Sequence, residues 1–259
     1  MKLRFLGVHN TESQQARMAA LLVDSTIAVD AGGLTSSLSF EAQTNLKALL
    51  LTHQHYDHVR DVPGIAMSFF LRRATLNVYS TVPVFRSLKT HLLDGDLYPD
   101  FFEPRGGSPS LVFNLIEPHQ TVRIDRYSVL AVPVIHSVPA VGFQITGEHG
   151  ESVFYTGDTG PGLFETWRHV SPHVLVIELT SCDHHADFGR EAGHLTPELL
   201  KGELLTFREL KGYLPRVVAV HMNPDLESEI AQQTEVVAKE LGADIVLAYE
   251  GMELELPAP

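Results

Sequence analysis

The sequence contains almost no cysteine and no long apolar run. Among its 259 residues only Cys182 is a cysteine, which excludes an intrachain disulfide and a metal site built on thiolates. No apolar run approaches the roughly 18 residues of a membrane-spanning helix. The first residues, MKLRFLGVHNTES, lack the apolar segment of a signal peptide and instead predict a first strand. We therefore expect a cytoplasmic protein that does not enter the membrane.

Basic residues are also scarce. The chain has 19 Lys and Arg against 32 Asp and Glu, a net charge of −13. Binding to a polyphosphate backbone depends on many Lys and Arg contacts, so this balance disfavours a large nucleic acid as ligand. The short basic stretch Arg72-Arg73 is interpreted as a solvated helix end. We expect a small-molecule substrate, with nucleic acid as the disfavoured alternative.

The remaining composition, 44% apolar and 20% charged, is ordinary for a soluble globular protein. The length fits one large domain or two small ones. Because no repeat or low-complexity linker interrupts the chain, we predict a single domain over residues 1–259. Its least regular part is 94–110, DGDLYPDFFEPRGGSPS, where Tyr98, Phe101 and Phe102 are expected to be exposed. A lid or substrate-binding arm and a surface excursion without a role are equally compatible with this segment.

Apolar runs separated by turn residues predict the secondary structure. Strands are expected over 3–7, 19–24, 26–32, 45–52, 75–80, 173–180, 215–222 and 243–251, and a β-rich stretch over 111–158. Helical patterns cover 59–73, 82–93, 196–210 and 226–242. This order fits an α/β domain with two mixed sheets between helices. Periodicity alone does not separate it from a doubly wound fold.

A dense cluster of histidines follows the strand at 45–52. Within the six residues HQHYDH stand His53, His55, Asp57 and His58. Imidazole and carboxylate together suit zinc, manganese or iron. These are too many ligands for one tetrahedral ion that also needs an open position, so we predict two ions. A set of surface histidines is the alternative, which this density at a strand end disfavours.

Three distant polar residues repeat the same pattern. His136, Asp158 and His221 each follow an apolar run, and Gly157 before Asp158 allows a tight turn. Any one of them alone would be interpreted as a capped or exposed strand end. Together with the cluster, they predict side chains that converge from several strand ends on one cleft.

The motif His-x-His-x-Asp-His at 53–58 is the hallmark of the metallo-β-lactamase superfamily, which the chain resembles from LRFLG to the closing YEGMELEL. Within that family it is similar to the branch of ribonuclease Z and the class II cyclic-nucleotide phosphodiesterases. The resemblance implies a four-layer αββα sandwich of two mixed β-sheets flanked by helices. It also implies the metal ligands: His53, His55 and His136 for one ion, Asp57, His58 and His221 for the other, and Asp158 between them.

Two residues beyond the ligands carry the resemblance to this branch. Ile177-Glu178-Leu179-Thr180 stands where ribonuclease Z has His-Glu-Ala-Thr, and Gly193-His194-Leu195-Thr196 stands at a Gly-His-Ser-Thr-like stretch. Glu178 and His194 are thus retained, whereas Ile177 replaces a histidine. That replacement and the lack of a long Gly- and Pro-rich arm weaken the transfer of tRNA processing to this chain.

The resemblance implies a hydrolytic reaction at two divalent ions, zinc in the first place and manganese or iron as alternatives. Such ions lower the pKa of water and polarise a substrate oxygen. Asp57 could bind an ion and take the nucleophile's proton, while His194, oriented by Glu178, could protonate the departing alkoxide. A purely supporting role for Glu178 and His194 is the alternative. Asp30 could hydrogen-bond a ligand imidazole or simply form a turn.

We therefore predict a dinuclear metal-dependent phosphodiesterase for a small phosphodiester such as a cyclic nucleotide. The alternatives are a tRNA 3′ endonuclease and a hydrolase of esters, thioesters or lactones. A redox di-iron protein is disfavoured, because that branch of the family has Glu where His55 stands, and a non-enzymatic metal-binding protein is disfavoured by His194. A homodimer is expected from the resemblance alone.

Two further features adjoin these motifs. Cys182-Asp183-His184-His185 follows the strand of Glu178 and is expected to line the cleft mouth. A third metal site there is disfavoured, because Cys182 has no second thiol as partner. Tyr56, inside the histidine cluster, is expected to pack against the protein.

Overall fold

The computed structural model describes residues 1–104 and 107–258 as two seven-stranded sheets. The first sheet has the order β14 (Glu253–Glu255), β1 (Lys2–Gly7), β2 (Ala20–Val23), β3 (Ile27–Val29), β4 (Ala48–Leu50), β5 (Leu76–Ser80), β6 (Leu111–Leu115). The second has the order β13 (Ile245–Leu247), β12 (Arg216–Val220), β11 (Val174–Glu178), β10 (Ser152–Tyr155), β9 (Val141–Thr146), β8 (Tyr127–Pro133), β7 (Thr121–Ile124).

Both sheets are mixed. In the first, β3 to β6 are parallel and the strands from β14 to β3 pair antiparallel. In the second, β10 to β13 are parallel and β7 to β10 pair antiparallel. The expectation of two mixed sheets is confirmed.

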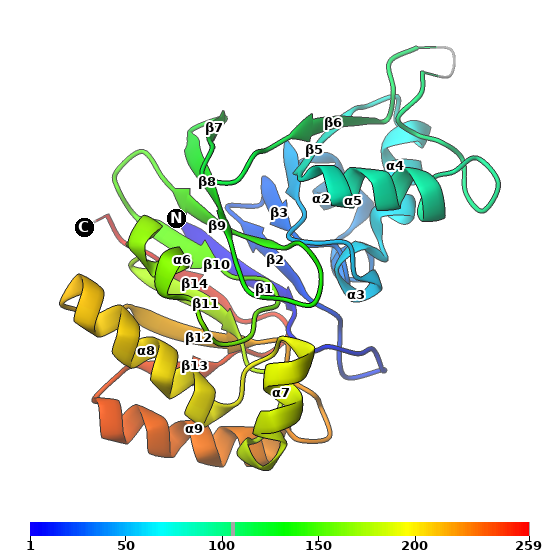
Figure 1. The fold of residues 1–259 in the computed structure, drawn as a ribbon. Helices are drawn as coiled ribbons and strands as arrows, with labels where there is room; N and C mark the ends of the chain where they lie inside the picture. The colour runs from blue at the N-terminus through cyan, green and yellow to red at the C-terminus, as the bar shows by residue number, and fades with distance from the viewer. Residues whose placement is uncertain (105–106, 259) are drawn as a thin grey trace.

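Helices cover the outer faces of both sheets (Figure 1). In chain order they are α1 (Leu34–Ser37), α2 (Phe40–Thr44), α3 (Tyr56–Val59), α4 (Val62–Leu71), α5 (Val82–Ser87) with the π-turn η1 (Leu88–Leu92), α6 (Phe164–His169), the 3₁₀ turn η2 (Asp183–His185), α7 (Ala186–Ala192), α8 (Pro197–Lys211) and α9 (Glu227–Leu241). Helices α4 and α5 lie on one side of the strands, and α8 and α9 lie on the other. The predicted four-layer sandwich is therefore confirmed.

The alternation of side chains along each strand separates two cores. In β2, Leu21 and Val23 join a core that includes Val129 and Val153 of the second sheet, whereas Leu22 joins the core beneath α1 and α4. Successive side chains of a strand point to opposite faces, and here both faces are covered. This is why the strands appear in the sequence as continuous apolar runs.

Strand direction places the predicted site at one edge of the sandwich. Strands β4 and β5 are parallel, as are β10 to β12, and β8 has the direction of β10 because both pair antiparallel with β9. The backbone N–H of Val141 donates to the carbonyl of Thr52 at 3.1 Å and joins the two sheets at this edge. Polar residues that follow β4, β8, β10 and β12 therefore meet there.

The segment 94–110 differs from the expectation. Phe101 is only 3% exposed, Tyr98 and Phe102 are half-buried, and all three pack against the core beneath α4 and α5, because their rings contact one another and neighbouring aromatics. Ser110 and Phe101 bond to the first residues of β5 and β6, at the edge opposite the ligands. This position gives no support to a lid, and residues 105–106 lie outside the described part.

Two other local predictions need comment. Tyr56 is 61% exposed, so the expectation that it packs is wrong: it begins the one-turn helix α3 and points outward while its neighbours point inward. The short helices α1, α2, α6 and α7 were not predicted, because a helix of one or two turns has too few residues to show a period. Over the described residues, no helix combines the length and apolar character that crossing a membrane requires.

Candidate metal centre

Four segments that are distant in sequence bring the seven predicted ligands together. His53 and His55 lie on the loop after β4, while Asp57 and His58 lie in α3. The other three follow strand ends: His136 after β8, Asp158 after β10 and His221 after β12. Their ligand atoms form two groups in which all atoms lie within 4.8 Å of one another, and Asp158 belongs to both groups.

The first group contains His53, His55, His136 and Asp158. Oδ2 of Asp158 lies 3.7 Å from Nε2 of His53 and 3.8 Å from Nε2 of His136. Nδ1 of His55 lies 3.1 Å from Nε2 of His136. Three imidazole nitrogens and one carboxylate oxygen thus face a common point.

The second group contains Asp57, His58, His221 and the other oxygen of Asp158. Oδ1 of Asp158 lies 3.1 Å from Nε2 of His58 and 3.4 Å from Nε2 of His221. Oδ2 of Asp57 lies 3.0 Å from Nε2 of His221. The two carboxylate oxygens of Asp158 therefore face different groups, which is the arrangement a bridging ligand requires.

The hydrogen bonding of these atoms fits a cation at each point. Within the described chain, Nε2 of His53, Nε2 of His58 and Oδ1 of Asp158 are buried without a well-aligned hydrogen bond. Buried polar atoms are nearly always satisfied, so orphaned atoms aimed at one point indicate a missing partner. Imidazole nitrogen and carboxylate oxygen are donors that divalent zinc, manganese and iron accept.

The protonation states favour the same use. Burial, together with the charge of neighbouring histidines, lowers the pKa of His53, His55 and His136, so these rings are neutral and keep a free lone pair. Burial opposes ionisation of Asp158 and Asp57, but hydrogen bonds and the charges of His58 and His221 outweigh it and lower both pKa values. The site therefore offers neutral imidazoles and ionised carboxylates.

A buried carboxylate orients two of the ligands. Asp30 is fully buried and lies 2.7 Å from Nδ1 of His58, which must donate because the carboxylate only accepts. The predicted bond from Asp30 to a ligand imidazole is thus confirmed. The backbone N–H of Thr52 also donates to Asp30 at 2.9 Å, and the Thr52 hydroxyl lies 3.0 Å from Nδ1 of His53. These bonds turn Nε2 of both rings toward the ligand groups.

Glu178 and His194 form a second hydrogen-bonded unit beside the ligands. Glu178 is fully buried and accepts from Nδ1 of His194 at 2.7 Å. It also accepts from the Thr180 hydroxyl at 2.8 Å, and that hydroxyl accepts in turn from Nδ1 of His221 at 2.8 Å. The His194 ring stacks on His221 with centroids 5.6 Å apart. The side chain of His194 stays 18% exposed, so its free Nε2 can reach a bound substrate.

The backbone at the site is held in uncommon conformations. His221 has φ of 64° and Asp30 has φ of 58°, values that cost free energy for residues other than glycine and collect at functional sites. Gly193, with φ of 80°, ends α7 and accepts from Nδ1 of His136 at 2.9 Å. A Cβ at Gly193 would lie 3.1 Å from the His136 ring, so glycine permits this approach.

A family model described as a beta-lactamase superfamily domain matches residues 22–222 of this chain. The chain belongs to the beta-lactamase superfamily. The predicted family and its hydrolase class are thereby confirmed, and the paired His and Asp groups are suited to divalent metals.

Solved structures of the same fold include both enzyme types of the predicted branch. Unliganded yeast PDE1 matches with a TM-score of 0.84 and 16% identity, over 98% of this chain and 99% of that one. The short form of human tRNase Z matches with a TM-score of 0.72 and 19% identity, over 99% and 100%. At such identities the likeness shows the shared fold.

A curated relative gives a closer but shorter sequence match. A ribonuclease Z of Methanococcus maripaludis is 29% identical over 99 residues, which cover 37% of this chain and 29% of the relative. The match therefore spans less than a third of that relative's length.

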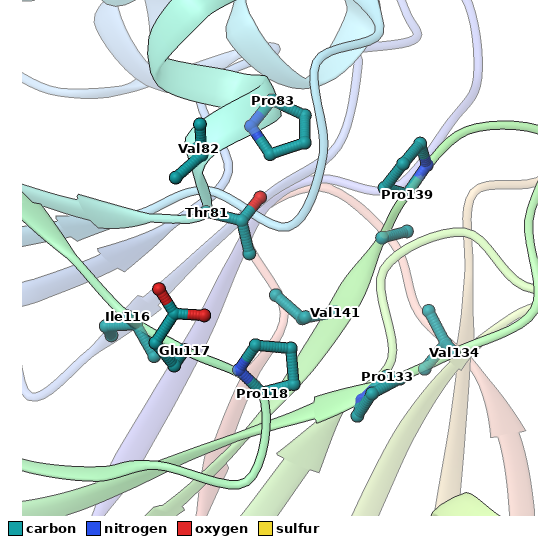
Figure 2. Close-up of a pocket in the computed structure, with 11 residues that line it drawn as sticks. Thr81, Val82, Pro83, Ile116, Glu117, Pro118, Pro133, Val134, Pro139 and Val141 are labelled. Carbon is teal, nitrogen blue, oxygen red and sulfur yellow. The ribbon is translucent and has the colours of Figure 1, made fainter.

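A cavity of about 320 Å³ adjoins this superfamily site (Figure 2). Thr81, Val82 and Pro83 at the start of α5 face Pro133 and Val134 after β8, and Ile116 to Pro118 and Pro139 to Val141 complete the walls. Val141 bonds to Thr52 beside His53, and Val134 stands two residues before His136. The walls are mainly apolar, with the carboxylate of Glu117 at the rim.

Sequence reasoning missed some supporting groups of this superfamily site. Thr180 joins Glu178 to His221, and the Gly193 carbonyl holds His136. Thr180 had a detectable signal, since residues i and i+2 of an extended strand face the same side and it stands two positions after Glu178. The Gly193 carbonyl had none, because any residue supplies a carbonyl.

Proposed function

We propose that the protein is a dinuclear metal-dependent phosphodiesterase that acts on a small phosphodiester such as a cyclic nucleotide. The observation that carries this proposal is the Glu178–His194 pair beside two ligand groups that share Asp158. A hydrogen-bond donor next to a pair of cation sites suits a substrate with a negatively charged phosphoryl group and an alkoxide leaving group.

Two divalent ions, with zinc preferred and manganese or iron as alternatives, would supply polarisation of a phosphoryl oxygen and a lowered pKa of water. His53, His55 and His136 would hold one, Asp57, His58 and His221 the other, with Asp158 between them. Asp30, Thr52, Thr180 and the Gly193 carbonyl would keep the ligand rings oriented.

The remaining roles belong to Asp57 and His194. Asp57 is partly exposed, with 23% of its side chain accessible, so it would accept the proton of the attacking water. Burial tends to lower the pKa of His194, but its bond to Glu178 and the charges of Asp158 and Asp57 raise it to about 9. The protonated ring would donate a proton from Nε2 to the departing alkoxide while Glu178 stabilises its charge.

The surroundings of the site support a small substrate. The net charge of −13 disfavours a long polyanion. The mainly apolar cavity would take the non-reacting part of the substrate, and Glu117 at its rim would accept hydrogen bonds from N–H groups such as those of a nucleobase. A homodimer and a cytoplasmic location remain predictions.

A tRNA 3′ endonuclease is the second candidate, supported by the similarity to ribonuclease Z. Ile177 argues against it less than the sequence alone suggests. Its side chain is fully buried in the core between the sheets, on the strand face opposite Glu178, so the replacement lies away from the metal ligands. Hydrolysis of an ester, thioester or lactone is the third candidate.

A substrate panel tests the proposal. Bis(p-nitrophenyl) phosphate, cyclic nucleotides, precursor tRNA and thioesters are assayed with the zinc-loaded and the manganese-loaded protein. We expect turnover of the two phosphodiester classes of small molecule. Turnover of thioesters alone would overturn the proposal, and cleavage of precursor tRNA alone would replace it by the second candidate.

A further inference from the structure

We propose that Cys182, His184 and His185, supported by Glu229, form a separate zinc site outside the dinuclear centre. The three ligands belong to the turn η2 and the residue before it, while Glu229 lies in the first turn of α9. Their candidate ligand atoms lie within 4.8 Å of one another. Because α9 supplies the carboxylate, the sequence around Cys182 alone understated this cluster.

The distances match tetrahedral coordination. Sγ of Cys182 lies 3.6 Å from Nε2 of His184 and 3.8 Å from Nδ1 of His185. A tetrahedral zinc with Zn–S of about 2.3 Å and Zn–N of about 2.1 Å places such ligand atoms roughly 3.5 Å apart. Small side-chain rotations are therefore sufficient to bind an ion, and His185 would exchange its 2.9 Å bond to the Ser181 hydroxyl for the metal.

Glu229 completes the arrangement. Its Oε1 lies 3.1 Å from Nδ1 of His184, which leaves Nε2 of that ring for the metal. A carboxylate on the far nitrogen of a ligand histidine fixes the ring and increases its basicity. The Gln233 amide also donates to Oε1 of Glu229 at 2.9 Å and holds the carboxylate in place.

The ligand types select the metal class. A thiolate with two imidazoles favours zinc over magnesium, calcium or manganese, which prefer oxygen. Cys182 is fully buried, and burial and the charge of Glu229 raise the pKa of its thiol. The thiol therefore keeps its proton until a metal displaces it. His184 and His185 are exposed, so an ion can enter from solvent and keep a water in the fourth position.

Such an ion would fasten the connection between β11 and α8, residues 179–196. This connection already bonds to α9 through Asp183, whose N–H donates to Gln233 at 2.8 Å, and to α8 through the N–H of Glu198, which donates to Asp183 at 2.8 Å. The same connection carries Gly193 and His194. The site would thus hold in place the segment that supplies the proposed proton donor.

Cobalt titration of the metal-free full-length protein tests the site, because only a thiolate ligand gives a strong near-ultraviolet charge-transfer absorption. Among the seven ligands of the dinuclear centre none is a cysteine. We expect this absorption in the wild type and in Asp158→Asn, which alters only the dinuclear centre. We expect Cys182→Ser to lack it and to bind one zinc ion fewer per chain.

Exposed positions separate the site from misfolding and from a thiol that binds metal alone. His184→Gln and His185→Gln should weaken cobalt affinity roughly tenfold or more, and His149→Gln, another exposed histidine, should not. Absence of the absorption in the wild type, its loss in Asp158→Asn, or equal affinity in the wild type and both His184→Gln and His185→Gln would each overturn the proposal. None of these outcomes depends on the substrate of the dinuclear centre.

Discussion

His194 shows how one buried carboxylate sets the state of a neighbouring ring. Glu178 is fully buried, and besides Nδ1 of His194 it accepts from the N–H groups of Thr159 and Thr180 at 3.1 Å and 3.0 Å. These donors keep the carboxylate ionised and immobile, so it holds a proton on His194 at neutral pH. The ring is therefore prepared to donate from Nε2.

Replacement of His194 should separate catalysis from metal binding. We expect His194→Ala to lower kcat about 10²- to 10⁴-fold, the usual contribution of a general acid, with metal content unchanged. Steady-state kinetics and metal analysis of the same preparation measure both, with the exposed His149→Ala as control. Parallel loss of metal and turnover would make His194 a structural residue.

Asp30 acts on the ligands rather than on the substrate. In Asp30→Asn the fully buried side chain keeps its size but loses the charge that faces Nδ1 of His58. We expect metal affinity to fall about 10- to 100-fold, measured by competition with a chelator. Asp125→Asn, which removes an exposed carboxylate paired with Lys47, is the matched control. Equal affinities in the two variants would contradict this role.

At the scale of elements, His9 joins segments that are far apart in sequence. Nδ1 of His9 lies 2.6 Å from Glu250 in the β13–β14 connection, and its Nε2 lies 3.3 Å from Glu227 at the start of α9. Burial alone would lower the pKa of His9, but these two carboxylates outweigh it and raise the pKa above 6.5. The same contact lowers the pKa of Glu250 against the effect of burial.

This contact should make stability depend on pH. Since the pKa of His9 is raised on folding, its contribution is fully present below the unfolded value and is lost as pH rises through the folded value. We expect His9→Gln to lower the free energy of unfolding by about 1–2 kcal/mol near pH 6 and by less near pH 9. Chemical denaturation at both pH values measures the difference, and an equal loss at both would contradict it.

At the scale of the whole molecule, the two ends of the chain lie in one sheet. β14 pairs with β1, and the N–H of Leu256 donates to the carbonyl of Met1 at 2.8 Å. The core between the sheets draws side chains from both, so neither sheet keeps its apolar face covered alone. We propose on this basis that residues 1–259 form a single domain.

A single domain should unfold as one unit. The only tryptophan, Trp167, is fully buried beside Phe154 and Phe207 and reports on the second sheet and its helices. Its fluorescence and the far-ultraviolet circular dichroism of the metal-free protein should share one denaturant midpoint. Two separate midpoints would show that the sheets unfold independently.

Local patterns sufficed for much of this architecture. Apolar runs with both faces covered predict the strands, and the motif at 53–58 with His136, Asp158 and His221 after strands predicts a shared edge. These features depend on neighbours within a few residues, where the rules of backbone geometry apply directly. Short helices and the direction of Tyr56 and Phe101 lay beyond them, because packing against distant segments overrides local preference.

The sequence by itself determined which residue types gather at the candidate centre, because each ligand stands directly after a strand whose direction the chain order constrains. Only the tertiary structure decided how they are arranged. It turned the two oxygens of Asp158 toward different groups, linked His221 to Glu178 through Thr180, and brought Glu229 of α9 beside His184. Such contacts join residues far apart along the chain, so they exist only once both sheets and their helices have packed.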